Sequence, residues 1–284
     1  MTPRLLSTTR RGLLTAAAAP MFLGLAGLEA LFAPKARLWQ RWTVHDENAQ
    51  SRIDHTPWDR FLSRYAVAGA DGITRVAYKT VPRSDRITLA DYLKGLRRAP
   101  VSRLSPDEQR AFWINLYNAL TLSIVLDHYP VRSIRDIDIS PGLFSDGPWD
   151  KKLTEIEGEP ISLNDIEHRI LRPIWKDPRL HYAVNCASLG CPNLQSVAFT
   201  AANTDTLLKA GARAYVNHPR GARVDHGRLV VSSIYLWFRP DFGGSDAGVI
   251  DHLKTYANSS LAASLATVTR IADHDYDWRL NDAG

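Results

Sequence analysis

Residues 105–128, SPDEQRAFWINLYNALTLSIVLDH, predict one long helix. Ser105 and Glu108 have the spacing of a capping box, and Pro106 occupies the first helical position, where its missing N–H is not needed. Apolar side chains then occur on nearly every side, so we expect this helix to lie at the centre of the fold. Pro130 follows the last predicted turn and marks its end.

Two asparagines, Asn115 and Asn118, interrupt this apolar helix. They are three residues apart and therefore lie on one face. Buried amides need hydrogen-bond partners, because burying them without partners is costly. Two interpretations are open: the amides bind loop backbones near the core, or they belong to a polar site.

Outward from this helix, the chain mixes helices and hairpins without a regular alternation, which predicts an α+β fold. We expect one globular domain, residues 43–284, in which the long helix packs against a small mixed or antiparallel sheet. The patterns predict helices over residues 58–67, 87–97, 162–174, 203–216 and 249–256, hairpins over 152–161 and 223–232, and strands over 73–81, 180–185 and 268–272.

The net charge of +5 lies outside the predicted domain. Residues 1–42 hold six basic side chains and one acidic side chain, and the remaining 29 basic residues balance 29 acidic ones. A neutral domain has no general electrostatic attraction for phosphate backbones, so we predict no nucleic-acid binding. Glycine-rich phosphate loops and the HExxH motif are absent from the sequence, and we predict no cofactor.

Residues 1–36 have the pattern of an export signal. Arg10 and Arg11 stand directly before an apolar run that extends from Gly12 to Ala33. Such a pair is read by the twin-arginine translocase, which carries folded proteins, so we predict that translocase as a partner during export. Cleavage leaves a periplasmic protein, whereas a retained signal anchors the protein to the inner membrane, because about 20 apolar residues span a bilayer.

Four segments carry a resemblance to a known family. They are FWINLYNA at 112–119, SLNDIEH at 162–168 with the following Leu171 and Arg172, HYAVNCASLGCP at 181–192, and YDWRLN at 276–281. In combination they resemble the domain of unknown function 547 family, with similarity from about residue 53 to residue 281. The activity of that family is not established, so the resemblance implies kinship and names no reaction.

The segment at 181–192 concentrates reactive side chains. On the predicted strand, His181 and Asn185 face the same side, and Cys186, Ser188 and Cys191 follow on a turn that Pro192 ends. Thiol enzymes of the papain or transglutaminase type use a histidine to activate a cysteine and an amide or carboxylate to orient the imidazole.

We therefore predict Cys186 as nucleophile and His181 as base, with Asn118 or Asp241 as the orienting group. Asn115, Asn185, Ser188 and Cys191 are predicted to line the same pocket. One observation argues against this interpretation, because in papain-like folds the cysteine begins the central helix, and here Ser105 does.

Three alternatives for the two cysteines stay open. Cys186 and Cys191 form a structural disulfide in an oxidising compartment, or they hold a metal together with His181 or His168, or they stay as free buried thiols. Trp237, Tyr276 and Trp278 are expected to be core aromatics.

Two functions follow. The first is a cysteine-dependent hydrolase or acyl transferase that acts on peptide or other envelope material. The second is a noncatalytic binding or assembly module of the envelope, with a protein or peptide partner and a structural Cys186–Cys191 disulfide.

Overall fold

The computed structural model describes residues 33–141 and 147–284. The predicted export segment therefore lies almost wholly outside the described residues. The helices are α2 (Thr56–Tyr65), α3 (Arg83–Leu96), α4 (Pro106–His128), α5 (Arg172–Trp175), α6 (Thr204–Val216), α7 (Ile234–Trp237), α8 (Asp246–Tyr256) and α9 (Ser259–Leu265). The strands are β1 (Ala66–Ala68), β2 (Thr74–Val76), β3 (Thr154–Ile156), β4 (Glu159–Ile161), β5 (Ala222–Asp225), β6 (Arg228–Ser232) and β7 (Ile271–Asp275).

Several short helical turns join these elements. Those of 3₁₀ type are η1 (Gln40–Thr43), η2 (Tyr78–Thr80), η3 (Val101–Arg103), η4 (Ile134–Asp136), η6 (Pro178–Tyr182) and η7 (Arg239–Phe242), and η5 (Asp165–Leu171) is a π-helix that continues into α5. The mixture of helices with small sheets confirms the α+β class. No helix among the described residues is long and apolar enough to cross a bilayer.

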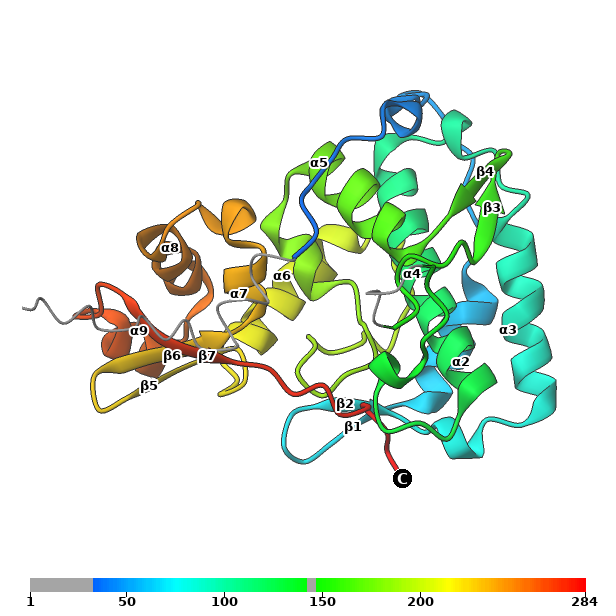
Figure 1. Ribbon diagram of the computed structural model, residues 1–284. Coiled ribbons are helices and arrows are strands. Elements are labelled where there is room, and N and C mark those ends of the chain that lie inside the picture. The colour runs from blue at the N-terminus through cyan, green and yellow to red at the C-terminus, as the bar shows by residue number, and fades with distance from the viewer. Residues whose placement is uncertain (1–32, 142–146) are drawn as a thin grey trace, which may run out of the picture.

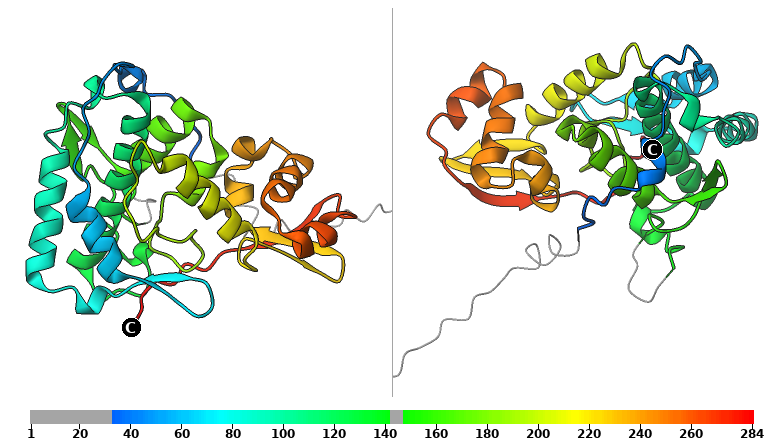
Figure 2. Two further views of the ribbon diagram at one scale, coloured as in Figure 1. Left: turned by 180° about the vertical axis from the view of Figure 1, so that it is seen from behind. Right: turned by 90° about the horizontal axis from the view of Figure 1, so that it is seen from above.

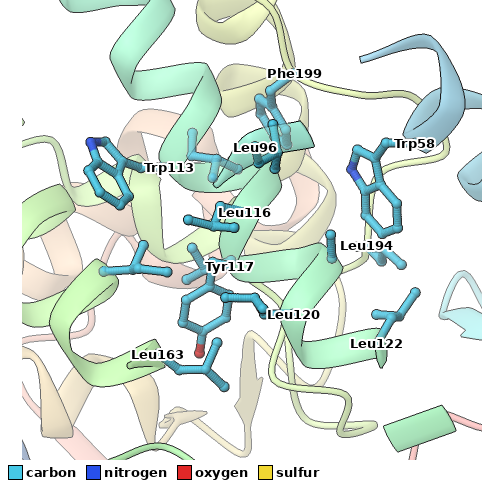
Figure 3. Close-up of a cluster of buried hydrophobic side chains, with 14 of the residues drawn as sticks. Trp58, Leu96, Trp113, Leu116, Tyr117, Leu120, Leu122, Leu163, Leu194 and Phe199 are labelled. Carbon is cyan, nitrogen blue, oxygen red and sulfur yellow. The ribbon is translucent and has the colours of Figure 1, made fainter. Parts of the chain in front are cut away.

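Helix α4 is the predicted central helix and is buried along most of its length. Ser105 caps it by accepting a hydrogen bond from the Glu108 backbone N–H, at 3.4 Å. The Glu108 carboxylate does not close the capping box, because it accepts a hydrogen bond from the Ile53 N–H instead, at 2.7 Å. Trp113, Leu116 and Tyr117 of α4 lie among apolar side chains of several other segments (Figure 3).

The prediction that α4 packs against a sheet was wrong. Its main neighbours are α3, η5 and α6. The sheets are small and lie around this helical core: β1–β2 and β3–β4 are antiparallel pairs, and β6 pairs with β5 antiparallel and with β7 parallel. Both predicted hairpins are confirmed, whereas the last strand begins three residues later than predicted.

The fold has two hydrophobic clusters. The larger one surrounds α4, and the smaller one lies between the β5–β6–β7 sheet and helices α6, α7 and α8. Figure 1 shows the small sheet with α8 and α9 on one side of the molecule and the α2–α3–α4 helices on the other, and Figure 2 shows the same division from behind and from above. After β7 the chain crosses to the larger part and ends beside β2, where the Val76 N–H donates to Asn281.

The predicted strand at residues 180–185 was also wrong, because the chain forms the 3₁₀ turn η6 there. Asp177 starts this turn by accepting a hydrogen bond from the Arg179 N–H, and Pro178 fixes its first position. His181 and Asn185 are therefore not related by strand alternation.

Asn115 and Asn118 instead stabilise irregular backbone next to α4. Asn115 donates to the Phe199 carbonyl and accepts from the Phe199 N–H, at 2.7 and 3.0 Å. Asn118 donates to the Ala183 carbonyl and accepts from the Asn185 N–H, at 2.9 and 2.8 Å. Each amide thus supplies the two hydrogen bonds that a neighbouring strand would supply.

Segment 33–39 lies along η5 and α5. Arg37 and Trp39 donate backbone N–H bonds to the carbonyls of His168 and Arg169, both at 2.9 Å. Arg172 in turn donates to the Pro34 carbonyl at 2.9 Å. These bonds connect the segment to the helical part that carries several site residues.

Replacing Asn118 with alanine leaves the Ala183 carbonyl and the Asn185 N–H buried without partners. We expect a loss of about 2–6 kcal/mol in the free energy of unfolding, since each of the two unsatisfied groups costs about 1–3 kcal/mol. Urea denaturation measures it. Asn48→Ala, at an exposed position, is the control and should change the free energy of unfolding by less than about 0.5 kcal/mol. Equal effects of the two variants would show that the backbone hydrogen bonds of Asn118 do not stabilise the fold.

Candidate functional site

A pocket of about 500 Å³ lies where the two hydrophobic clusters meet. Its walls come from segment 33–39, α4, η5, the loop after η6, α7 and the segment after β7. The residues that line it are Ala33, Pro34, Tyr117, Arg135, Trp149, Asp150, Asn164, Glu167, His168, His181, Val184, Cys186, Cys191, Pro192, Ile234, Trp237, Phe238, Tyr276 and Trp278.

The loop that carries Cys186 is held in an unusual backbone conformation. Ala187 has φ of 60°, in the left-handed region that few non-glycine residues adopt. The Asn185 side chain accepts from the Ala187 N–H at 2.9 Å, and Asn281 donates its backbone N–H to the Ala187 carbonyl at 3.0 Å. Together with Asn118, these contacts position the cysteine without any regular secondary structure.

The C-terminal segment runs along the same loop and brings Tyr276 to it. Gly190 donates its N–H to the Asp277 carbonyl at 2.8 Å. A Cβ atom at Gly190 would lie 2.7 Å from the Asp277 backbone nitrogen, so only glycine permits this approach. Tyr276, at the start of the segment, then lies beside the thiol.

Three donors surround the half-buried Cys186 sulfur. It lies 3.1 Å from Cys191 Sγ, 3.3 Å from Ser188 Oγ and 3.2 Å from Tyr276 Oη. The hydrogen bond from Cys191 lowers the pKa of Cys186 to about 7 against the opposing effect of burial, and those from Ser188 and Tyr276 act in the same direction. Burial raises the pKa of Tyr276 well above its ordinary value, so its hydroxyl stays a donor.

Cys191 has the opposite character. It is only 4% exposed, and burial raises its pKa well above the ordinary value. Cys191 therefore stays protonated, and its S–H donates a hydrogen bond to the Cys186 sulfur. Both cysteines are free thiols in the structure, and the described residues contain no cluster of three or more histidine, cysteine or carboxylate side chains arranged to hold a metal.

Glu167, on η5, is the buried carboxyl group of the pocket. Burial raises its pKa to about 7 against the opposing effect of Arg172, and the negative charge of Cys186 contributes to this increase. Its Oε1 lies 3.7 Å from His181 Nδ1. At neutral pH Glu167 and Cys186 thus bind a proton with similar affinity.

His181 is held by Asp241 rather than by the thiol. Its Nε2 lies 2.7 Å from Asp241 Oδ2, and Arg172 donates to the same oxygen at 2.6 Å. Burial opposes the ionisation of Asp241, but hydrogen bonds from His181 and Arg172 outweigh it and lower the pKa of Asp241 to about 2. Burial lowers the pKa of His181. A neutral imidazole then carries its proton on Nε2, which leaves Nδ1 as an acceptor that faces Glu167.

The structure therefore brings Cys186, His181 and Cys191 to one pocket. Ser188 lies against the Cys186 sulfur without lining the pocket, and Asp241 pairs with His181. The structure gives Asn115, Asn118 and Asn185 backbone contacts outside the pocket lining. Among the described residues no hydrogen bond joins His181 to Cys186, since both ring nitrogens face carboxylates.

Sequence reasoning missed Glu167 and Tyr276 as site residues, and it placed the tryptophans Trp237 and Trp278 in the core. Both tryptophans are half-buried and line the pocket. Glu167 and Tyr276 each belong to a segment that carried the family resemblance, which is the one signal that pointed to them.

Comparison with known proteins bears on one part of the chain. Residues 101–216 match the model of a protein family of unknown function, DUF547. The match is narrower than the resemblance over residues 53–281. No curated protein and no solved structure matches the chain.

The DUF547 match contains Glu167, His181 and both cysteines, along with the asparagines of α4. Asp241 and Tyr276 lie beyond it. The Cys186 thiol and the Glu167 carboxyl group thus lie within the region that matches DUF547. Tyr276 and Asp241, which shift the pKa values of these two groups, come from the C-terminal part of the chain.

The rate of alkylation tests whether the pKa of Cys186 is lowered in the folded protein. In the reduced native protein, we expect iodoacetamide to label Cys186 with a rate that rises with pH around a midpoint near 7, because the thiolate is the nucleophile. Tyr276→Phe removes a donor and should move the midpoint upward. In urea both cysteines should react around the ordinary midpoint, about 8.5; the same midpoint in the native protein would contradict the tuning.

Glu167 makes stability depend on pH. Its pKa is about 7 when folded and about 4.5 when unfolded, so between these values the unfolded chain binds fewer protons and stability falls as pH rises. The total loss is about 3 kcal/mol at 1.36 kcal/mol per unit. Relative to the wild type, Glu167→Gln should therefore gain about that much between pH 4 and pH 8 in urea denaturation. Glu155→Gln, at an exposed position, serves as control, and a parallel pH profile for both variants would refute the assignment.

Proposed function

We propose that the protein is a cysteine-dependent hydrolase or acyl transferase in which Cys186 is the nucleophile. The observation that carries this proposal is the Cys186 sulfur itself, which lines a pocket and receives hydrogen bonds from three donors. A thiol with a pKa near neutral is about half ionised at pH 7, and the thiolate is the reactive form.

In the first step the Cys186 thiolate attacks a substrate carbonyl carbon. The bond to the leaving group breaks, a thioester forms, and protonated Glu167 supplies the proton that the leaving group takes. In the second step water or an acceptor attacks the thioester, Glu167 takes back a proton, and the Cys186 thiolate leaves. A carboxyl group with a pKa near the working pH suits both proton transfers.

His181 acts through Glu167 in this scheme. Asp241 holds the imidazole so that Nδ1 faces the Glu167 carboxyl group at 3.7 Å. This separation is longer than a hydrogen bond, so the neutral imidazole affects Glu167 as a neighbouring polar group that limits where the carboxyl group lies. His181 is then a positioning residue rather than the base that the sequence predicts.

The hydroxyls of Ser188 and Tyr276 are the candidate donors to the oxyanion. They bind the thiolate before the reaction, and they become available when the sulfur forms its bond to carbon. Donors placed in advance at a developing negative charge contribute strongly to catalysis.

The chemistry we propose resembles that of papain- and transglutaminase-type enzymes in its cysteine, histidine and carboxylate. The arrangement is different, because Cys186 lies in a loop after η6 and α4 begins with Ser105. The likeness we propose therefore concerns chemistry and not architecture.

We further propose that the protein leaves the cytoplasm through the twin-arginine translocase and works in the periplasm or at the inner membrane, on peptide or other envelope material. The support is Arg10 and Arg11 before an apolar run.

A second function is favoured by one observation, the 3.1 Å separation of the two sulfurs. A disulfide between Cys186 and Cys191 would remove the nucleophile and leave a noncatalytic envelope binding or assembly module. Intact mass before and after reduction separates the two: protein from the periplasmic fraction should carry both thiol hydrogens under the enzyme proposal, and a mass two hydrogens lighter favours the module.

Acylation by p-nitrophenyl acetate tests the enzyme proposal directly. We expect a burst of one p-nitrophenol per protein and an acetyl group on Cys186 by mass spectrometry. Cys186→Ser should abolish the burst, and Tyr276→Phe should slow it about a hundredfold through loss of an oxyanion donor. Ser264→Ala, on exposed α9, is the control. Unchanged acylation of Cys186→Ser, or the absence of any burst in the reduced wild type, would refute the proposal.

A further inference from the structure

Four aromatic side chains form one continuous wall of the pocket. The Tyr276 ring lies 4.9 Å from Trp237 and 4.7 Å from Trp278, measured between centroids. Trp237 stacks on Trp278 at 5.6 Å, and Trp149 meets the edge of Trp278 at 5.9 Å. We call these four residues the aromatic wall.

The wall packs against the two hydrophobic clusters through Trp149, Trp237 and Tyr276, and it also faces the pocket. All four of its residues are half-buried and line the pocket. Clustered half-exposed aromatic surface is unusual in a folded protein and marks sites of binding.

The wall starts at the nucleophile. Tyr276 donates its hydroxyl to the Cys186 sulfur at 3.2 Å, and the ring of the same residue contacts Trp237 and Trp278. A substrate carbonyl at Cys186 therefore has the aromatic wall directly beside it.

Helix α7 extends the apolar surface past the wall. Ile234, Trp237 and Phe238 are three and four residues apart, so they share one face of the turn, and all three line the pocket. Phe238 stacks on the His181 ring at 4.5 Å and thus separates the apolar surface from the His181–Asp241 pair.

The charges of the pocket favour an uncharged group on this surface. Glu167 and Cys186 share negative charge at neutral pH, which disfavours an anion. The Arg172 guanidinium is bound to Asp241 and the Pro34 carbonyl.

Most polar side chains near the wall already have partners, and the exception is the buried Trp237 Nε1, a donor that has no partner among the described residues. Asn164 donates to the Asp150 carboxylate at 2.7 Å, and Arg135 lies over the Trp278 ring at 5.2 Å. This leaves few groups to receive the hydroxyls of a sugar, so the surface suits a hydrocarbon better than a saccharide.

We propose that the aromatic wall binds the apolar acyl group of the substrate, so that the substrate class is esters, thioesters or amides of hydrocarbon-chain acids. The inference rests on the proposed function, in which Cys186 takes up the acyl carbonyl. The hydrocarbon tail then lies along Tyr276, Trp237 and Trp278, with Ile234 on the far side.

Binding of unreactive analogues tests the wall separately from catalysis. The probes are neutral N-methyl amides of straight-chain acids from two to ten carbons, titrated calorimetrically into the full-length Cys186→Ala protein. Because each buried methylene is worth about fourfold in affinity, we expect the dissociation constant to fall about fourfold per added methylene until the pocket is filled. A dissociation constant that does not change with chain length would overturn the proposal.

Variants of the wall sharpen the test. Trp237→Ala should flatten the chain-length series, whereas Trp237→Phe should keep most of it. Trp175→Ala, at a half-buried tryptophan that packs on the larger cluster outside the pocket, is the matched control and should leave the series unchanged. Loss of the series in the control as well would refute a specific role of the wall.

Two further outcomes are decisive. Tighter binding of N-acetylglucosamine oligomers than of the ten-carbon amide would overturn the acyl proposal in favour of a saccharide. A steep chain-length series without any p-nitrophenyl ester burst from the wild type would support the acyl site while refuting the catalytic role of Cys186.

Discussion

The hydrogen bonds of Asn115 and Asn118 are the constraint on which the rest of the structure depends. They allow α4 to lie against backbone that forms neither helix nor strand, at Phe199 and at residues 183–185. Without such partners, irregular backbone at this depth would leave buried polar groups unsatisfied. A helix that is otherwise apolar on nearly every side thus carries, at two positions, the groups that organise its neighbours.

The loop that carries Cys186 and Cys191 is held in place by hydrogen bonds that begin at Asn118. Asn118 accepts a hydrogen bond from the Asn185 backbone, and the Asn185 side chain binds the backbone of the residue after each cysteine, Ala187 and Pro192. Asn281, in the C-terminal segment, donates to the Asn185 side chain. The loop can therefore hold Ala187 in a left-handed conformation and keep Cys186 beside its donors. The same packing also sets the charges of the pocket, because burial raises the pKa of Glu167 and lowers the pKa of His181.

Local patterns predicted the parts of the fold that local forces decide. The capped apolar run of α4 and the two hairpins with glycine turns were confirmed, since their hydrogen bonds close within a few residues. The strand at 180–185 failed because Asp177 and Pro178 start a 3₁₀ turn that apolar alternation does not register. The sequence offered Asp241 and Asn118 as alternative partners of His181 and did not place Tyr276 in the site, because these contacts span 60 and 90 residues and no local pattern decides them.

Segment 33–39 makes the beginning of the described chain part of the pocket. Pro34 lines the cavity and offers its carbonyl to Arg172, whose guanidinium also holds Asp241. The charged groups of the pocket therefore contact the chain close to the point where the predicted export segment ends. A protein shortened past residue 34 would lose both part of the cavity wall and the carbonyl that accepts a hydrogen bond from Arg172. A bulky tag joined at this position would lie beside the pocket and could block it.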